Sequence, residues 1–320
     1  MHGNELRLGL IGAGRWGKRY IETIRGMSGV RLAVVVSRNQ ETTHLVPDAA
    51  VLNDWRDLVA GDLDGVVIAT PPATHSEILR SMVSAGIPTM VEKPLCLDLT
   101  EALALRDLVG KSKVLVLVDH THLFHPAFTA LKVHGEELGP VRFVRSEGAA
   151  FGPFRPDVSV LWDWAPHDVS LCLDLLNRVP DRVSALGDDG SVTVWLHFDN
   201  DTSAWIANSN LSLQKRRLLT VYFEHHALVL DDSAIDKLKE YKVDFEGSSR
   251  NFTFDSGNIL PVPQGMPLTC AVSYFVQGIR GGDTARFGLD LACDVIRTID
   301  AAQRALDQTQ PQMLLNVPIS

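Results

Sequence analysis

The chain has 320 residues, which is enough for two globular domains at roughly 100 to 200 residues each. Hydrophobic residues make up 45% of it and charged residues 22%, values that exclude a disordered chain and allow a sizeable core. There are 30 Lys and Arg against 39 Asp and Glu, so the formal net charge of -9 argues against binding to nucleic acid or to an anionic membrane surface.

The cysteines and the apolar runs indicate the cellular compartment. Cys96, Cys172, Cys270 and Cys293 are far apart, and no pair has metal-ligand spacing. No apolar run approaches the roughly 18 residues that a membrane span requires, and the N-terminal residues lack a signal-peptide pattern. We therefore expect a cytoplasmic protein with no membrane partner.

Short apolar runs alternate with helix-period segments in the first third of the chain, a pattern typical of βαβ units and a parallel sheet. The runs lie at residues 6–11, 31–36, 65–69, 88–91 and 114–118. Because they are almost continuously apolar, we expect strands that helices cover on both faces. Thr74 with Glu77, and Asp98 with Glu101, have the spacing of capping boxes that open helices. Residues 1–120 are thus predicted to form a doubly wound Rossmann domain.

A glycine-rich turn directly follows the first run and opens a helix. Gly12, Gly14 and Gly17 give the pattern GxGxxG, with Arg15 and Trp16 between the last two. The first glycine permits a tight turn, the second lets the backbone approach a pyrophosphate, and the third allows close packing of helix and strand. Helix N-terminal amides then face the phosphates. Since the strand and helix context is present, the turn predicts a dinucleotide cofactor site.

The end of the second run bears on the choice between NAD and NADP. An NAD site usually has an acid here that binds the ribose 2′-hydroxyl, but this chain has Ser37 and Arg38. A hydroxyl and a guanidinium can bind a 2′-phosphate, which a carboxylate would repel. The pair therefore favours NADP. The alternative is that Arg38 is a surface residue and that the protein accepts either cofactor.

Glu92, Lys93 and Pro94 directly follow the run at residues 88–91, at the carboxyl edge where open α/β sheets bind ligands. Lys93 can donate a hydrogen bond to a substrate oxygen on which negative charge develops. Pro94 biases Lys93 toward an extended backbone. We place Glu92 and Lys93 at the cofactor and Lys93 also in the chemistry.

Three histidines follow the last apolar run. His120, His122 and His125 could form a metal site, but no carboxylate or thiolate completes a ligand set at fixed spacing. We expect no metal, and we assign His120, His122 and the neighbouring Phe124 to the substrate pocket.

Asp163 and His167 flank the predicted start of an apolar helix, where Pro166 suits the first helical position. The positive end of the helix dipole disfavours imidazolium, so we expect His167 to be neutral and able to accept a proton near pH 7. Asp163 can bind the same substrate hydroxyl or orient the ring. Trp164 either packs in the core or stacks on a sugar ring.

The rest of the chain is predicted to be an α+β domain, residues 121–320, with an open and mainly antiparallel sheet. Apolar side chains alternate with polar or aromatic ones over residues 192–198, and a turn at residues 199–201 leads to a return strand at residues 202–209. Because the open face must be covered, we expect a homodimer or homotetramer through this sheet. A last helix, about 286–306, should pack back on the first domain.

Together these motifs resemble the glucose-fructose oxidoreductase, inositol dehydrogenase and MocA family (Gfo/Idh/MocA). The resemblance is carried by the glycine-rich turn, by Ala69-Thr70-Pro71-Pro72-Ala73-Thr74-His75, by Glu92-Lys93-Pro94, and by Asp163 with His167. It implies a Rossmann domain plus an open-sheet domain, and hydride transfer between a nicotinamide and a carbon of a sugar, cyclitol or sugar nucleotide. It also implies that Lys93, Asp163 and His167 are catalytic.

The resemblance further implies that Thr70, Pro71, Pro72 and His75 flank the cofactor. One departure is Leu123, which stands where many relatives have an arginine of an Arg-Phe pair. A second pointer is the stretch 157–168, which resembles a branch associated with polysaccharide and sugar-nucleotide genes.

The sequence thus predicts an NAD(P)-dependent dehydrogenase in which His167 takes the hydroxyl proton and Lys93 stabilises the developing alkoxide. Two alternatives stay open. One is a nicotinamide-sensing regulator of the same fold that turns over no substrate. The other is a linear-tetrapyrrole reductase, whose planar substrate would not need the Asp and His pair.

Overall fold

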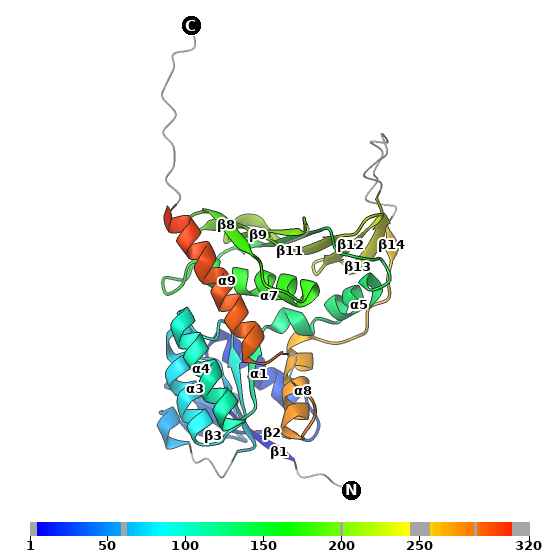
Figure 1. Cartoon of the computed structure of the whole chain (residues 1–320). Coiled ribbons are helices and arrows are strands. Elements are labelled where there is room, and N and C mark those ends of the chain that lie inside the picture. The colour runs from blue at the N-terminus through cyan, green and yellow to red at the C-terminus, as the bar shows by residue number, and fades with distance from the viewer. Residues whose placement is uncertain (1–4, 59–62, 199–200, 244–256, 285–286, 309–320) are drawn as a thin grey trace.

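The structure is a computed structural model of the whole chain, and it describes residues 5–58, 63–198, 201–243, 257–284 and 287–308. It contains two sheets, one above the other in Figure 1, with helices beside and between them. Some sequence-based expectations fall outside the described ranges: the N-terminal residues 1–4, most of the turn at residues 199–201, and residue 286 at the start of the predicted last helix.

The first sheet is parallel, and its six strands have the order β3-β2-β1-β4-β5-β6. They are β1 Leu6–Ile11, β2 Val30–Val36, β3 Ala50–Leu52, β4 Gly65–Ile68, β5 Thr89–Glu92 and β6 Val116–Asp119. The strands β4, β5 and β6 are buried along their whole length, so the Rossmann sheet and its covered faces are confirmed. No sequence pattern predicts β3, because it has three residues and none of them is fully buried.

Helices on both sides of the first sheet come from both ends of the chain (Figure 1). They are α1 Arg15–Arg25, α3 His75–Ser84, α4 Leu99–Ser112 and α8 Pro267–Ile279, with a short α2 at Thr42–Leu45. A Cβ on Gly65 of β4 would lie 2.7 Å from Ile279 Cδ1 and 3.1 Å from the Phe275 ring, so glycine lets α8 pack directly on the strand. The helix α8, which lies beyond residue 120, therefore covers part of the Rossmann sheet. The division of the chain into domains 1–120 and 121–320 stays a proposal.

One predicted helix cap is wrong. The helix α3 begins beside Thr74, but the Thr74 hydroxyl lies 2.7 Å from Thr70 Oγ1 and 2.8 Å from Pro71 O in the preceding turn. The hydroxyl hydrogen-bonds within the preceding 3-10 turn and makes no cap hydrogen bond to the helix, a local competition that serine and threonine hydroxyls commonly enter. Asp98 does cap α4, since its carboxylate accepts a hydrogen bond from Glu101 N at 2.8 Å.

The second sheet has eight strands in the order β14-β13-β12-β11-β7-β10-β9-β8. They are β7 Phe143–Phe151, β8 Arg182–Gly187, β9 Ser191–His197, β10 Ser203–Ser209, β11 Leu211–Tyr222, β12 His226–Asp231, β13 Leu238–Lys242 and β14 Asn258–Ile259. Only β10 and β7 pair in parallel, so the mainly antiparallel sheet is confirmed. In β9, Val192, Val194 and Leu196 are buried while Trp195 is exposed, as the alternation predicts.

Helices α5 Pro126–Gly135, α6 Val160–Asp163 and α7 Ala165–Leu176 pack on the side of the second sheet that faces the first (Figure 1). The last helix, α9 Leu289–Gln308, contacts α4 at one end and β8 at the other. No helix within the described ranges is long and apolar enough to cross a membrane.

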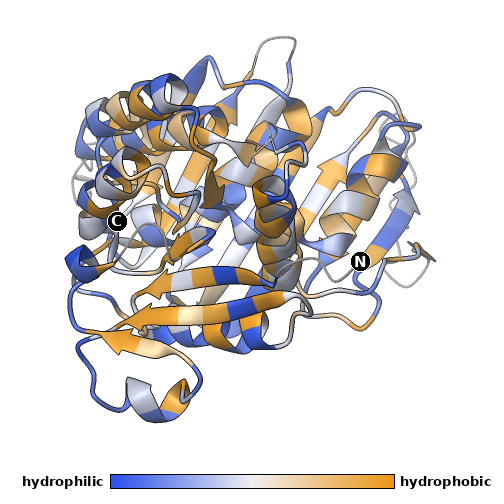
Figure 2. Cartoon of the chain, turned by 90° about the horizontal axis from the view of Figure 1, so that it is seen from below, coloured by the Kyte–Doolittle hydropathy of each residue, from blue (hydrophilic) through white to orange (hydrophobic). Residues whose placement is uncertain are grey.

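One apolar cluster runs through both parts of the molecule. Its members include Leu8 and Leu10 of β1, Phe128 of α5, Val144 of β7 and Val194 of β9. Figure 2 shows the corresponding pattern, with long hydrophobic stretches on strands and mixed hydropathy on helices. Since burial of apolar surface is the main favourable term in folding, this shared core holds the second part of the chain against the carboxyl edge of the first sheet.

Candidate active site

The glycine-rich turn between β1 and α1 has the backbone that a dinucleotide site requires. Gly12 has a φ of +101°, and a Cβ there would lie 2.6 Å from Ala69 O. A Cβ on Gly17 would lie 2.0 Å from Gly12 O, so the helix can pack this closely only with glycine. A Cβ on Gly14 would meet nothing within 4 Å, which leaves open space at the helix N-terminus. These are the three roles expected of the motif.

The surface beside Gly14 is hollow and basic. The hollow measures about 630 Å³ and is lined by Ala13, Gly14, Arg15, Lys18, Arg19, Glu22 and Asn39. Three cations face one carboxylate there, and the N-terminus of α1 adds a partial positive charge. Trp16, in the same turn, is 42% exposed. Both the charge and the open space beside Gly14 fit the phosphates of a nicotinamide dinucleotide.

Ser37 and Arg38 follow β2, and no acidic residue occurs at positions 37–40. Ser37 Oγ accepts hydrogen bonds from Asn39 N at 3.2 Å and from Thr42 Oγ1 at 2.8 Å, so this hydroxyl shapes the turn after the strand. Arg38 is exposed. The pKa of Asp54 is lowered by its hydrogen bond with Arg56 N and, to a smaller extent, by the charge of Arg38. The site therefore offers an exposed guanidinium, with the carboxylate of Asp54 within electrostatic range, where the ribose of a bound dinucleotide lies in this fold.

Lys93 and Asp163 meet at the carboxyl end of β5. The Lys93 Nζ donates to Asp163 O at 2.6 Å and to Asp163 Oδ1 at 3.2 Å, and the lysine side chain is only 6% exposed. Arg155 Nη1 donates to the same Asp163 Oδ1 at 3.2 Å, while its other nitrogens bind Asp157. One carboxylate oxygen thus accepts from two cations, and the sequence patterns gave no signal for Arg155.

His167 lies in the first turn of α7 and is buried. Burial, followed by the charge of Lys93, holds the pKa of His167 well below its usual range. The imidazole is therefore neutral near pH 7, as predicted, although burial and not the helix dipole is the main cause. The His122 ring packs edge-on against it, with centroids 4.5 Å apart. Within the described residues, His167 Nδ1 has no hydrogen-bond partner, so Asp163 does not orient the ring.

The three histidines after β6 have separate surroundings. Burial, and then the charge of Lys93, lowers the pKa of His120 to about 3, and neither of its ring nitrogens has a partner in the described structure. His122 packs on His167, as above. His125 Nδ1 accepts from Ala127 N at 3.0 Å and so caps α5, and its Nε2 bonds to Asp232 Oδ1 at 3.0 Å. His120 and His122 thus lie near the candidate site, whereas His125 has a structural role.

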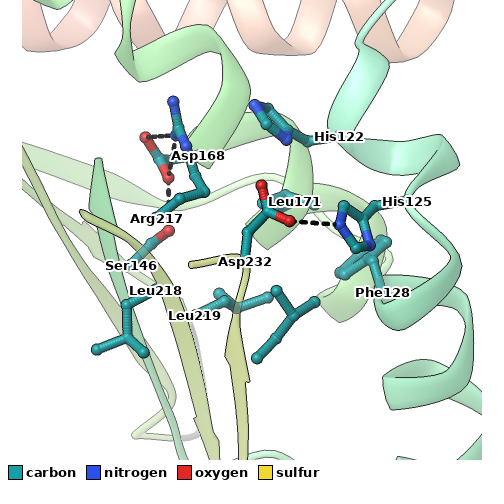
Figure 3. Close-up of a pocket in the computed structure, with 11 residues that line it drawn as sticks. His122, His125, Phe128, Ser146, Asp168, Leu171, Arg217, Leu218, Leu219 and Asp232 are labelled. Atoms are coloured by element: carbon teal, nitrogen blue, oxygen red, sulfur yellow. Dashed lines mark hydrogen bonds and ion pairs between the residues drawn. The ribbon is translucent and has the colours of Figure 1, made fainter. Parts of the chain in front are cut away.

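A small cavity borders His122 on the side of the second sheet (Figure 3). Its volume of about 20 Å³ is room for roughly one water molecule, which is too small for a sugar. On one side, the fully buried Asp168 accepts from Ser146 Oγ at 2.6 Å, from Asn208 Nδ2 at 2.7 Å and from Arg217 Nη1 at 3.3 Å. This network ties α7 to strands β7, β10 and β11 of the second sheet.

Two residues assigned to substrate from the sequence have other neighbours. The Phe124 ring packs on Tyr274 and Phe287, at centroid distances of 5.4 and 4.7 Å. The ring is thus packed on two aromatic side chains, and its assignment to the substrate pocket stays a prediction. The Arg217 guanidinium lies over the Trp164 ring, 5.4 Å from its centroid, so Trp164 has one face covered.

The loop expected to flank the cofactor is tied to the loop that carries Lys93. His75 Nδ1 lies 2.9 Å from Pro94 O, and its Nε2 lies 2.8 Å from Thr70 O. Pro71 and Pro72 lie between, at the start of the 3-10 turn. His75 is fully buried and links the loops that follow β4 and β5, and its assignment to the cofactor site stays a prediction.

Comparison with known proteins gives the family. The model of an oxidoreductase family with an NAD-binding Rossmann fold, GFO_IDH_MocA, matches residues 6–120. A solved structure of a putative oxidoreductase from Magnetospirillum magnetotacticum MS-1 is 41% identical and covers 93% of this chain and 100% of its own, with a TM-score of 0.86. The chain belongs to the Gfo/Idh/MocA family.

Other members of this family have named activities. The UDP-N-acetylglucosamine 3-dehydrogenase of Acidithiobacillus ferrooxidans is 28% identical over 71% of this chain and 74% of its own length. The inositol 2-dehydrogenase of Rhizobium meliloti is 28% identical over 64% of this chain and 68% of its own. The predicted enzyme class, a nicotinamide-dependent dehydrogenase, is confirmed by this membership.

Within this Gfo/Idh/MocA member, sequence reasoning missed one buried cluster next to Lys93. The Tyr20 hydroxyl lies 3.0 Å from Glu92 Oε1 and makes a closer contact with Asp119 Oδ2. Asp119 ends β6 just as Glu92 ends β5, and the two residues are paired in the sheet. Their shared position at the carboxyl edge was a signal that could have revealed the cluster. Glu92 is thus buried beside Lys93, and its assignment to the cofactor site stays a prediction.

Proposed function

We propose that the protein is an NAD(P)-dependent dehydrogenase that transfers a hydride between nicotinamide and a secondary alcohol or ketone of a sugar, cyclitol or sugar nucleotide. The observation that carries the proposal is the contact of Lys93 Nζ with Asp163, beside a buried and neutral His167. The activities named for the relatives, on UDP-N-acetylglucosamine and on inositol, support this class of substrate.

The geometry suits acid–base chemistry at a carbinol carbon. Bound nicotinamide supplies the hydride acceptor. His167 takes the hydroxyl proton, because its neutral imidazole has a free nitrogen and burial excludes competing water. The Lys93 ammonium has three hydrogens, of which two point to Asp163, and the third can stabilise the developing alkoxide. Asp163, fixed by Lys93 and Arg155, keeps an acceptor for a neighbouring hydroxyl.

NADP is the proposed cofactor. The exposed guanidinium of Arg38 and the absence of an acidic residue at positions 37–40 support it, since a 2′-phosphate needs a cation and is repelled by an acid. Dissociation constants for NADP and NAD, measured by the quenching of tryptophan fluorescence, test the preference. We expect tighter binding of NADP, and a tenfold preference for NAD, about 1.4 kcal/mol, would contradict it.

The outer face of the second sheet is proposed as the contact between subunits of a homodimer or homotetramer. Ala227, Val229 and Tyr241 form an apolar cluster there, and the face is hollowed between Arg145 and Arg216.

The cytoplasm is the proposed compartment. Cysteines stay reduced there, and Cys96, Cys172, Cys270 and Cys293 are all free thiols.

The decisive experiment mixes the protein with NADP or NAD and a panel that includes UDP-N-acetylglucosamine, myo-inositol and free hexoses. We expect the absorbance band of the reduced nicotinamide to grow with at least one of them. Binding of cofactor with no such change for any member of the panel, in either direction of the reaction, would favour the sensing regulator over the enzyme.

A further inference from the structure

A buried group of acids lies directly beneath Lys93. Tyr20 from α1 stands between Glu92 at the end of β5 and Asp119 at the end of β6. Tyr20 and Asp119 are 0% exposed, and Glu92 is 5% exposed. Glu92 Oε2 also accepts a hydrogen bond from Lys93 N at 3.1 Å. The cluster is therefore connected through Glu92 to the backbone of the proposed catalytic lysine.

Counting hydrogens shows that the cluster must hold an extra proton. A tyrosine hydroxyl has one hydrogen, so it can donate to only one of the two carboxyl groups that it contacts. If both carboxyl groups were ionised, the other would face the lone pairs of Tyr20 and a second buried anion. One carboxyl group must therefore be protonated and donate to the Tyr20 oxygen.

The Tyr20 hydroxyl makes its closer contact with Asp119 Oδ2, so we infer that its hydrogen goes to Asp119 and that Glu92 is the protonated member. Burial, and then the charge of Asp119, raises the pKa of Glu92 to about 8. Burial raises the pKa of Asp119 to about 6, and the hydrogen bond from Tyr20 acts against this rise. At pH 7 the hydrogen bonds then run in one direction, from the Glu92 hydroxyl to Tyr20 and from the Tyr20 hydroxyl to the Asp119 carboxylate.

We propose that Glu92 is a neutral acid in the folded protein and that Glu92, Tyr20 and Asp119 form a directed hydrogen-bond chain that positions Lys93. The neutral Glu92 holds the Lys93 amide without adding a second anion, so the lysine ammonium pairs with Asp163. Only the catalytic purpose of this positioning rests on the proposed function. The state of the proton does not.

A carboxyl titration tests the proton directly. In protein labelled with ¹³C at the glutamate carboxyl carbons, the Glu92 resonance is identified by its loss in Glu92→Gln, and Glu137→Gln serves as the exposed control. The groups that face Glu92 and influence this titration are Tyr20 from α1, Asp119 from β6 and Lys93 from its own strand end. We expect a midpoint near pH 8, and a midpoint near the usual 4.5 would overturn the proposal.

The pH dependence of stability is an independent measurement. Because the pKa of Glu92 in the folded protein lies above its usual value, the folded state holds a proton that the unfolded state has lost between about pH 4.5 and about pH 8. Wild-type stability should fall with rising pH over that window. Glu92→Gln lacks this loss, so its denaturation midpoint should rise relative to the wild type as pH rises. A constant difference between the two proteins would contradict a neutral Glu92.

Kinetics test the positioning role once the panel has identified a substrate. Glutamine can donate to Tyr20 and accept from Lys93 N, whereas alanine can do neither. The kcat of Glu92→Gln should exceed that of Glu92→Ala by at least about tenfold, the scale expected when a catalytic group loses its placement, with cofactor affinity equal in both. Equal kcat values would remove the positioning role. If the titration succeeds and no substrate is turned over, the neutral acid stands and the dehydrogenase proposal fails.

Discussion

Lys93 and Asp163 are 70 residues apart in the chain, yet the Lys93 Nζ lies 2.6 Å from the Asp163 carbonyl oxygen and 3.2 Å from its Oδ1. Lys93 is fixed by the carboxyl edge of the parallel sheet, and Asp163 by the short helix α6 that precedes α7. The contact thus joins the two parts of the molecule at the place where open α/β sheets bind ligands.

Replacing Lys93 by methionine removes the charge and keeps the length of the side chain. We expect kcat to fall by about 10²- to 10³-fold, the scale seen when one donor to a developing oxyanion is lost. The measurement is steady-state kinetics on the substrate that the panel identifies, with the exposed Lys111→Met as the matched control. Equal activity in the two variants would exclude Lys93 from the chemistry.

His167→Ala tests the proton acceptor. We expect turnover to drop at least about 100-fold while the dissociation constant of the cofactor stays the same, because the imidazole acts on the substrate proton and not on the dinucleotide. His225→Ala, in an exposed turn, is the control for general effects. An unchanged turnover number for His167→Ala would show that another group accepts the proton.

The pH profile should carry the signature of a buried histidine. Burial and the Lys93 charge keep the pKa of His167 well below 6.5, so the proton-accepting form persists as pH falls. For alcohol oxidation we expect kcat/KM to lose no activity through protonation of this group down to pH 6.5. An acidic limb with a midpoint at or above 6.5, lost in His167→Ala, would contradict the buried and neutral state.

Substitutions at two glycines distinguish an effect on folding from an effect on cofactor binding. Gly14→Ala adds a methyl group that meets nothing within 4 Å, so the fold should keep its stability while NADP binds more weakly, since the methyl group stands where the pyrophosphate approaches. Gly17→Ala would place a Cβ 2.0 Å from Gly12 O and should lower the denaturation midpoint strongly. Thermal unfolding and titration with NADP measure both effects. Undiminished NADP binding by Gly14→Ala would argue against a dinucleotide at this turn.

Much of the fold follows from local pattern. Continuous apolar runs predict β1, β2, β4, β5 and β6, because strands covered on both faces have no polar side to display. The short edge strand β3 was not predictable, because three residues are too few to show a periodic pattern. The packing of α8 on Gly65 was not predictable either, because it joins residues some 200 positions apart in the chain.

The candidate site was predictable only where a telling residue type coincides with the end of a strand or a helix. Lys93, Asp163 and His167 stand at the ends of recognisable elements, and their types indicate their chemistry. Tyr20 and Arg155 are ordinary residues in sequence, and only tertiary contacts with Glu92 and Asp163 give them a role. Phe124 stands near the histidines in sequence, but that position gave no sign of the two aromatic rings on which it packs.

A crystal structure with NADP bound is the most direct measurement of the central claim. We expect the pyrophosphate at Gly14 and the nicotinamide ring at the carboxyl end of β5, with Lys93 Nζ and the His167 ring both facing its reactive carbon. A nicotinamide ring elsewhere, or side chains of Lys93 and His167 that turn away from it, would contradict the proposed hydride transfer.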